Sequence, residues 1–146
     1  MADFEERRLP VGIQSFKEIR RNNYAYVDKT EIVWNLVNRG KKYNYLSRPR
    51  RFGKSLLVDT LQTYFEGRCD LFEGLKIMNL EKEWKKSPVI RLDMSRAGAS
   101  EKTIRSYLSM AFSREEAKYG ITMHEGASLA DRFDTIIQTA CQQTGE

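Results

Sequence analysis

Four stretches of the chain repeat apolar residues at every third or fourth position, the spacing that gathers side chains on one face of an α-helix. The first stretch runs from about residue 29 to residue 39. It opens with the capping-box-like pair Asp28 and Glu31 and ends at Gly40. Its apolar face consists of Ile32, Val33, Leu36 and Val37. We therefore expect a helix at 29–39.

The same spacing predicts three further helices. The second follows a loop that carries Gly53, and Gly67 is well placed to cap its carboxyl end. The third extends from a Ser100 cap to Gly120, and the fourth starts at Ser128. Their apolar positions are, in chain order, Leu56, Leu57, Leu61, Tyr64 and Phe65; Ile104, Tyr107, Leu108, Ala111 and Phe112; Leu129, Phe133, Ile136, Ile137 and Ala140.

Two shorter runs predict β-strands. Residues 43–46 are β-prone and break at a loop that contains Pro49, while residues 89–94 follow Pro88 and end at the turn 95–100. Residues 69–84 predict no regular structure beyond a turn or two. Because a strand, a loop and a helix follow one another, the pattern indicates the α/β class with a parallel sheet.

Composition narrows the class of protein. The chain has 146 residues, of which 40% are hydrophobic and 31% charged, which is typical of one soluble globular domain. No run approaches the roughly 18 apolar residues of a membrane helix, and the start is too charged for a signal peptide, so we expect a cytoplasmic protein without a membrane partner. Cys69 and Cys141 stand far apart and outside any CxxC pair, which argues against a zinc site or a disulfide framework.

The positive charge is concentrated in one interval. The formal net charge is +5, and no acidic residue occurs between Glu31 and Asp59. The cations in that interval are Arg39, Lys41, Lys42, Arg48, Arg50, Arg51 and Lys54. An anionic ligand is expected there, and either a compact phosphate or a nucleic-acid backbone fits the charge.

Residues 48–55 match seven of the eight positions of the phosphate-binding pattern G-x-x-x-x-G-K-[ST], with Arg48 in place of the first glycine. Gly53 would let the backbone approach phosphate, Lys54 would reach the β and γ phosphates as the catalytic cation, and Ser55 would offer its hydroxyl to Mg²⁺. The expected ATP-binding residues are Pro49, Arg50, Arg51, Phe52, Gly53, Lys54, Ser55 and Leu56. The alternative is a chance helix start with a solvated lysine.

Four segments in order resemble the AAA-ATPase-like family of prokaryotic proteins: 9–16 (LPVGIQSF), 26–30 (YVDKT), 46–55 (LSRPRRFGKS) and 71–75 (LFEGL). That family commonly has RPRRFGKS in its phosphate-binding loop, so Arg48 looks like a family trait. The resemblance implies an AAA-like P-loop ATPase with a three-layer fold, often followed by a nuclease domain that acts on nucleic acid. It also implies that residues 26–30 lie near adenine, although a plain helix cap is an equal alternative. A homo-oligomer is a further candidate assembly.

One part of the ATPase pattern is missing. Hydrolysis usually needs an apolar strand that ends in Asp-Glu, but in the nearest run, 89–93, Arg91 interrupts the apolar residues and Met94 replaces the second acid. We read Asp93 as a structural turn cap. Two strands also make a poor parallel sheet.

We therefore expect residues 1–146 to be the amino-terminal part of one domain, with a helical segment at 9–40 and the start of the P-loop core at 41–146. The full protein would hydrolyse ATP, and this piece alone would be weak or inactive. The alternatives are a nucleic-acid phosphate-binding module and a P-loop scaffold without hydrolysis.

Overall fold

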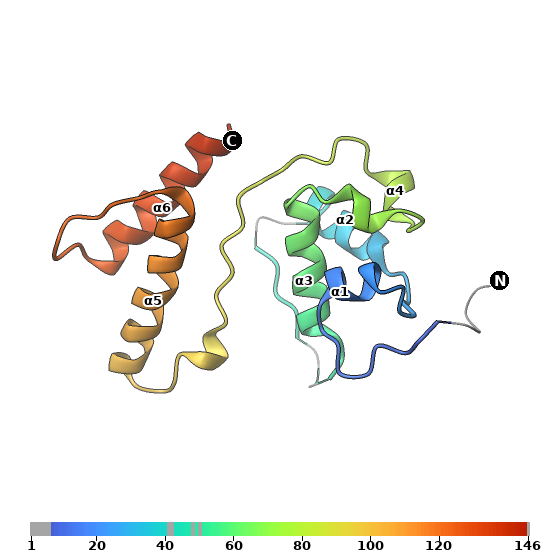
Figure 1. Cartoon of the computed structure of the whole chain (residues 1–146), viewed down its shortest axis with the longest axis horizontal. Coiled ribbons are helices and arrows are strands. Elements are labelled where there is room, and N and C mark those ends of the chain that lie inside the picture. Colours follow the sequence, from blue (N-terminus) through green and yellow to red (C-terminus); the bar gives the residue numbers. More distant parts are fainter. Residues whose placement is uncertain (1–6, 41–42, 48, 50, 146) are drawn as a thin grey trace. The chain divides into compact units, whose positions relative to one another are not determined.

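A computed structural model describes residues 7–40, 43–47, 49 and 51–145. The chain divides into two compact units, Met1–Lys86 and Ser87–Glu146. Helices make up the regular structure of both units, and none of the described residues forms a β-strand (Figure 1).

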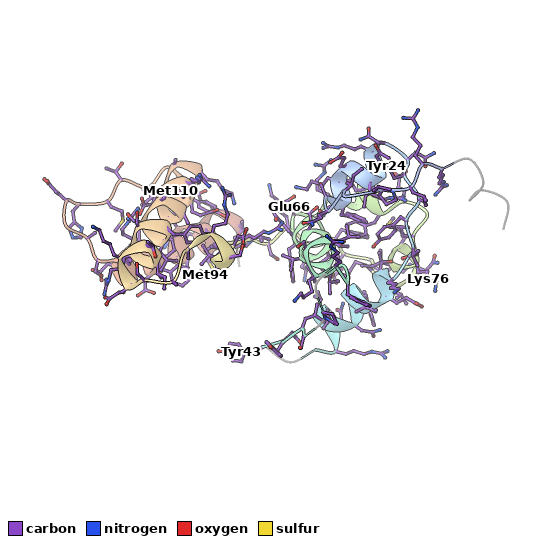
Figure 2. The ribbon with its side chains drawn as sticks, turned by 90° about the horizontal axis from the view of Figure 1, so that it is seen from below. Tyr24, Tyr43, Glu66, Lys76, Met94 and Met110 are labelled. Carbon is purple, nitrogen blue, oxygen red and sulfur yellow. The ribbon has the colours of Figure 1, made fainter. Side chains whose placement is uncertain are left out.

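The absence of a sheet in the described part of the chain overturns the expected α/β fold. Residues 43–47 and 88–93 are irregular, although their composition favours strands. Strand propensity depends on packing against neighbouring strands, and neither segment has a ladder partner among the described residues. Tyr43 and Tyr45 are accordingly 84% and 93% exposed, and Figure 2 shows Tyr43 projecting away from the helices of its unit.

Among the described residues of the amino-terminal unit, five short helices pack around one apolar core. The helices are α1 (Phe16–Arg21), α2 (Thr30–Asn38), α3 (Lys54–Phe65), η1 (Cys69–Phe72) and α4 (Ile77–Leu80). Phe16 and Phe72 lie at the centre, fully buried, with their ring centroids 4.8 Å apart. The ring of Trp84 lies 5.0 Å from that of Phe72, so the irregular segment after α4 also contributes to the core.

Hydrogen bonds of side chains hold these helices to one another. The Arg20 guanidinium of α1 donates to the carbonyl oxygens of Leu71 and Glu73 at 2.8 and 2.6 Å. Lys17 forms an ion pair with Glu66 after the end of α3, with 2.5 Å between nitrogen and oxygen. Helix α1 was not predicted as a separate element, and these contacts show that it is an integral part of the unit.

The carboxyl-terminal unit contains η2 (Met94–Arg96) and a pair of longer helices, α5 (Glu101–Tyr119) and α6 (Leu129–Thr144), which pack against each other. Both long helices start where the sequence predicted, with complete capping boxes at Ser100 and Ser128, and α5 ends at Gly120 in a left-handed conformation. No helix of the described residues combines the length and apolar character needed to cross a bilayer.

A largely buried ion pair joins α5 to α6. The Arg132 guanidinium donates to both carboxylate oxygens of Glu116, at 2.6 and 2.8 Å, and to the hydroxyl oxygen of Ser109 at 2.7 Å. The rings of Phe112 and Phe133 stack beside it with 5.3 Å between centroids. Polar and apolar contacts therefore fix the same helix pair.

Candidate phosphate and base site

The glycine of the phosphate-binding pattern lies at the start of a helix, as predicted. Gly53 is the N-cap of α3 with φ 73° and ψ 19°, and Lys54 and Ser55 are the first two helical residues. The first amides of an α-helix have no partner within the helix, and the helix dipole makes this end positive. A left-handed residue followed by a right-handed one also directs successive N–H groups into one concavity, an arrangement that suits an anion.

Backbone conformation, rather than crowding, accounts for the glycine at position 53. A Cβ atom added there would meet no heavy atom within 4 Å, but the positive φ is strained for any other common residue. Arg51, two residues before Gly53, also has a positive φ, 68°, which costs a non-glycine residue on the order of 1 kcal/mol. Such strain concentrates at ligand-binding loops.

The other predicted residues of the loop are less informative. Phe52 is 63% exposed, and Pro49 belongs to no helix or strand. Lys54 and Ser55 are both exposed, and Leu56 is half-buried. Arg48 and Arg50, like Lys41 and Lys42 of the basic interval, lie outside the described residues.

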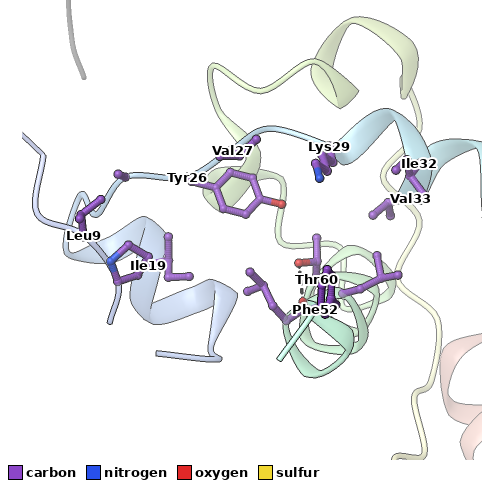
Figure 3. Close-up of a pocket in the computed structure, with 14 residues that line it drawn as sticks. Leu9, Ile19, Tyr26, Val27, Lys29, Ile32, Val33, Phe52 and Thr60 are labelled. Carbon is purple, nitrogen blue, oxygen red and sulfur yellow. Dashed lines mark hydrogen bonds between the residues drawn. The ribbon is translucent and has the colours of Figure 1, made fainter. Parts of the chain in front are cut away.

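A pocket of about 540 Å³ opens beside Gly53 (Figure 3). One wall consists of residues 52–53 and of Leu56, Leu57 and Thr60 on α3. The facing walls come from residues 9–10, from Ile19 of α1, from residues 25–27 and 29, and from Ile32 and Val33 of α2. The structure thus places much of the predicted 26–30 segment next to the predicted phosphate loop.

Tyr26 has a fixed position in this pocket. Its ring packs edge-on against Phe16 with 5.3 Å between centroids, and Thr60 lines the same pocket. The Thr60 hydroxyl donates to the carbonyl oxygen of Leu56 at 2.8 Å. Burial raises the pKa of the Tyr26 phenol above its usual value.

Asp28 caps α2, although not in the predicted way. The N-cap residue is Lys29, and Asp28 accepts hydrogen bonds from the backbone N–H and hydroxyl of Thr30, at 2.9 and 2.7 Å. It also accepts from the backbone N–H of Lys76 at 2.7 Å, next to α4. Partial burial opposes ionisation, but these hydrogen bonds hold the pKa of Asp28 below its usual value. The carboxylate thus links α2 to α4.

Several residues of the pocket were not predicted from the sequence as part of a site, among them Leu9, Ile19, Ala25 and Thr60. A signal for α1 was present, since Ser15 with Glu18 has the S-x-x-E spacing of a capping box, and Ser15 accepts from the Glu18 N–H. No comparable signal in the sequence shows that α1 packs beside α3.

The structure supports a structural role for Asp93. Its carboxylate accepts from the backbone N–H and hydroxyl of Ser95, at 3.2 and 2.6 Å, and caps η2. Its own N–H donates to the Tyr107 hydroxyl at 2.8 Å. Within the described part of the chain, no cluster of three or more His, Cys, Asp or Glu residues is arranged to hold a metal ion.

Comparison with known proteins covers almost the whole chain. The family model described as "Predicted AAA-ATPase" matches residues 10–146. A protein of Azotobacter chroococcum mcd 1, described as an uncharacterized protein in the vnfD 5' region, is 35% identical over 142 residues. That alignment covers 96% of this chain and 27% of the relative, so the chain spans about a quarter of the relative's length. No solved structure matches the chain. The expected downstream nuclease domain stays a prediction.

Proposed function

The chain belongs to the predicted AAA-ATPase family, and we propose on that basis that it binds ATP, with the triphosphate at the start of α3 and the adenine in the neighbouring pocket. The observation that carries the proposal is the position of the pocket. It shares Gly53 and Leu56 with the helix start, so a ligand could occupy both places at once.

The triphosphate would bind mainly to backbone groups. The amides at the start of α3 and the helix dipole favour an anion, and the space above Gly53 leaves room for a phosphate to approach the backbone. Lys54 would add a positive charge beside the β and γ phosphates, with Arg51 close by in sequence.

Mg²⁺ fits the same place through Ser55. A magnesium ion bound with a nucleotide keeps several water ligands and takes one or two from the protein, so the absence of a carboxylate cluster among the described residues is compatible with it. When bound, the ion would neutralise charge on the phosphates. The Ser55 hydroxyl, at the second position of α3, would be the protein ligand.

The base would be held by apolar contact. The pocket is within the range of about 300–1,000 Å³ that small-molecule sites have, and most of its lining side chains are apolar. The fixed ring of Tyr26 and the side chains of Ile19 and Leu57 provide surfaces for a flat ring system.

Hydrolysis by the full-length protein is part of the proposal, with the acidic residues for it supplied outside this chain. We therefore expect the 146-residue chain to bind ATP without appreciable turnover. The full protein would couple such binding to hydrolysis through carboxylates that position Mg²⁺ and water.

Isothermal titration of the 146-residue chain with Mg-ATP tests the proposal. Lys54→Ala should weaken binding by about tenfold or more, because a charge-assisted contact to phosphate is lost. Lys102→Ala, which removes an exposed lysine of α5, is the matched control and should leave affinity unchanged. Equal affinities for wild type and Lys54→Ala would reject the proposal. Salt-sensitive binding of DNA with no ATP binding would favour the nucleic-acid alternative.

A further inference from the structure

A second cavity, of about 480 Å³, lies in the amino-terminal unit and shares no lining residue with the pocket beside Gly53. Its lining residues are Arg8, Asn22, Asn23 and Tyr24. The two segments that form it are in contact, because the backbone N–H of Ala25 donates to the carbonyl oxygen of Arg8 at 2.9 Å. Figure 2 shows Tyr24 at the edge of its unit. The cavity thus lies where the loop after α1 meets the amino-terminal segment.

Every side chain of this lining is polar, and none of the four has a hydrogen bond or an ion pair with another described residue. Arg8, Asn22 and Asn23 are exposed, and Tyr24 is half-buried, so a solute can reach the cavity. A guanidinium, two carboxamides and a phenol hydroxyl all donate hydrogen bonds, and no carboxylate side chain lines the cavity. The lining therefore combines unpaired donors with a positive charge, which favours an anion.

These donors suit a phosphate group better than a carboxylate. Arginine presents its N–H groups as a planar fork that binds two oxygens of one phosphate or carboxylate. Both oxygens of a carboxylate are then used, whereas a phosphate has further oxygens that point in other directions. Carboxamide and phenol donors around the same cavity find acceptors on those remaining oxygens.

We propose that this cavity is a second ligand site, which binds a phosphate group independently of the ATP site. The Arg8 guanidinium supplies the charge and the fork, and the carboxamides of Asn22 and Asn23 donate to the other oxygens. Free phosphate and the backbone of single-stranded DNA present the same group, and the experiment below separates these two sources. The inference goes beyond the proposed function and does not depend on it.

Three substitutions test the assignment. Arg8→Gln removes the charge and the fork from the cavity. Arg21→Gln is the matched control, because Arg21 is exposed, carries the same charge and lines neither cavity. Asn23 has a positive φ of 51°, a conformation that glycine adopts without strain, so Asn23→Gly removes the carboxamide while the backbone is retained.

The experiment is a titration of the 146-residue chain with inorganic phosphate at constant ionic strength, followed by nuclear magnetic resonance. The side-chain amide signals of Asn22 and Asn23 should shift in the wild type. Arg8→Gln should weaken this binding by about tenfold or more, since a charge-assisted pair of hydrogen bonds is lost. Asn23→Gly should weaken it less, and Arg21→Gln should leave it nearly unchanged because exposed charges are screened.

Two further ligands identify the chemistry and the source. Acetate should bind more weakly than phosphate, and equal binding would overturn the assignment to phosphate. A short single-stranded DNA without terminal phosphates that displaces phosphate, and needs Arg8 as phosphate does, would support the site and identify a nucleic-acid backbone as its ligand. Phosphate binding without such competition would support the site for a small phosphorylated molecule.

The outcomes also separate this inference from the proposed function. Shifts at Asn22 and Asn23 should persist in Lys54→Ala, which alters the phosphate loop alone. Shifts confined to residues 53–55 would overturn the second site and leave the ATP site standing. An equal loss of affinity in Arg8→Gln and Arg21→Gln would show attraction by general charge and would also overturn it.

Discussion

The carboxylate of Asp59 accepts a hydrogen bond from the backbone N–H of Phe16 at 2.7 Å. Asp59 lies on α3, one turn after Ser55, and Phe16 is the first residue of α1. A side chain of the helix that starts at the candidate phosphate loop therefore caps the helix whose Ile19 lines the pocket. This bond therefore connects α3, which starts at the candidate phosphate site, with α1, which lines the neighbouring pocket.

Loss of that bond should destabilise the amino-terminal unit. Asp59→Ala should lower the free energy of unfolding by about 1–3 kcal/mol, since it removes a charged acceptor from a backbone N–H that has no partner within its helix. Asp59→Asn keeps an acceptor oxygen and should cost less. Both tryptophans, Trp34 and Trp84, lie in this unit, so denaturant unfolding followed by tryptophan fluorescence reports on it. Equal stability of Asp59→Ala and wild type would contradict the link.

Substitution of Gly53 should lower the affinity for ATP as well as the stability of the fold. Gly53→Ala and Gly74→Ala form a matched pair, because both residues have φ 73° and neither added Cβ would meet an atom within 4 Å. Each should cost on the order of 1 kcal/mol in stability. In titrations with Mg-ATP, Gly53→Ala should also lose about tenfold in affinity, since its Cβ would lie where phosphate approaches the backbone. Equal ATP affinity in the two variants would argue against phosphate at Gly53.

Acid should weaken the α5–α6 pair through one carboxylate. Hydrogen bonding to Arg132 holds the pKa of Glu116 below its usual 4.5. Because the folded state lowers this pKa, the stabilisation is complete above the unfolded value and is lost as pH falls through the folded value. The protection factors of the amides in residues 101–144, which correct the exchange rates for the intrinsic effect of pH, should therefore fall below pH 4.5.

Substitution of the same residue checks that assignment. Glu116→Gln should weaken protection by about 1–3 kcal/mol at neutral pH and remove much of the acid dependence. Glu101→Gln is the control, since the pair of Glu101 with Arg105 is largely exposed and such pairs contribute about 0–1 kcal/mol. An acid response that is unchanged in Glu116→Gln would show that other groups cause it.

Helix starts and ends were predictable from the sequence because their signals are local. Ser100, Gly120 and Ser128 act within a few residues, and each has the predicted cap role. The start of α3 after Gly53 was predictable for the same reason. The apolar periodicity predicted less reliably which side chains of a helix are buried. Ile137, for example, was expected to face inward and is 39% exposed.

Strands and pocket walls were not predictable in the same way. A β-prone run such as 43–46 becomes a strand only when another strand pairs with it, and pairing depends on the rest of the fold. The walls of the pocket likewise depend on the packing of α1 beside α3, which rests on contacts between residues 43 to 49 positions apart, such as Phe16 with Asp59 and Lys17 with Glu66. The spacing of residues within one segment does not predict such long-range contacts.

The most direct test of a bipartite ATP site is nuclear magnetic resonance with fragments of the ligand. Mg-ATP should shift the amide signals of Gly53, Lys54 and Ser55 together with those of Tyr26 and Lys29. Inorganic triphosphate should shift mainly the first group, and adenosine mainly the second. Shifts by Mg-ATP that spare residues 53–55, or that appear only in the α5–α6 unit, would contradict the account.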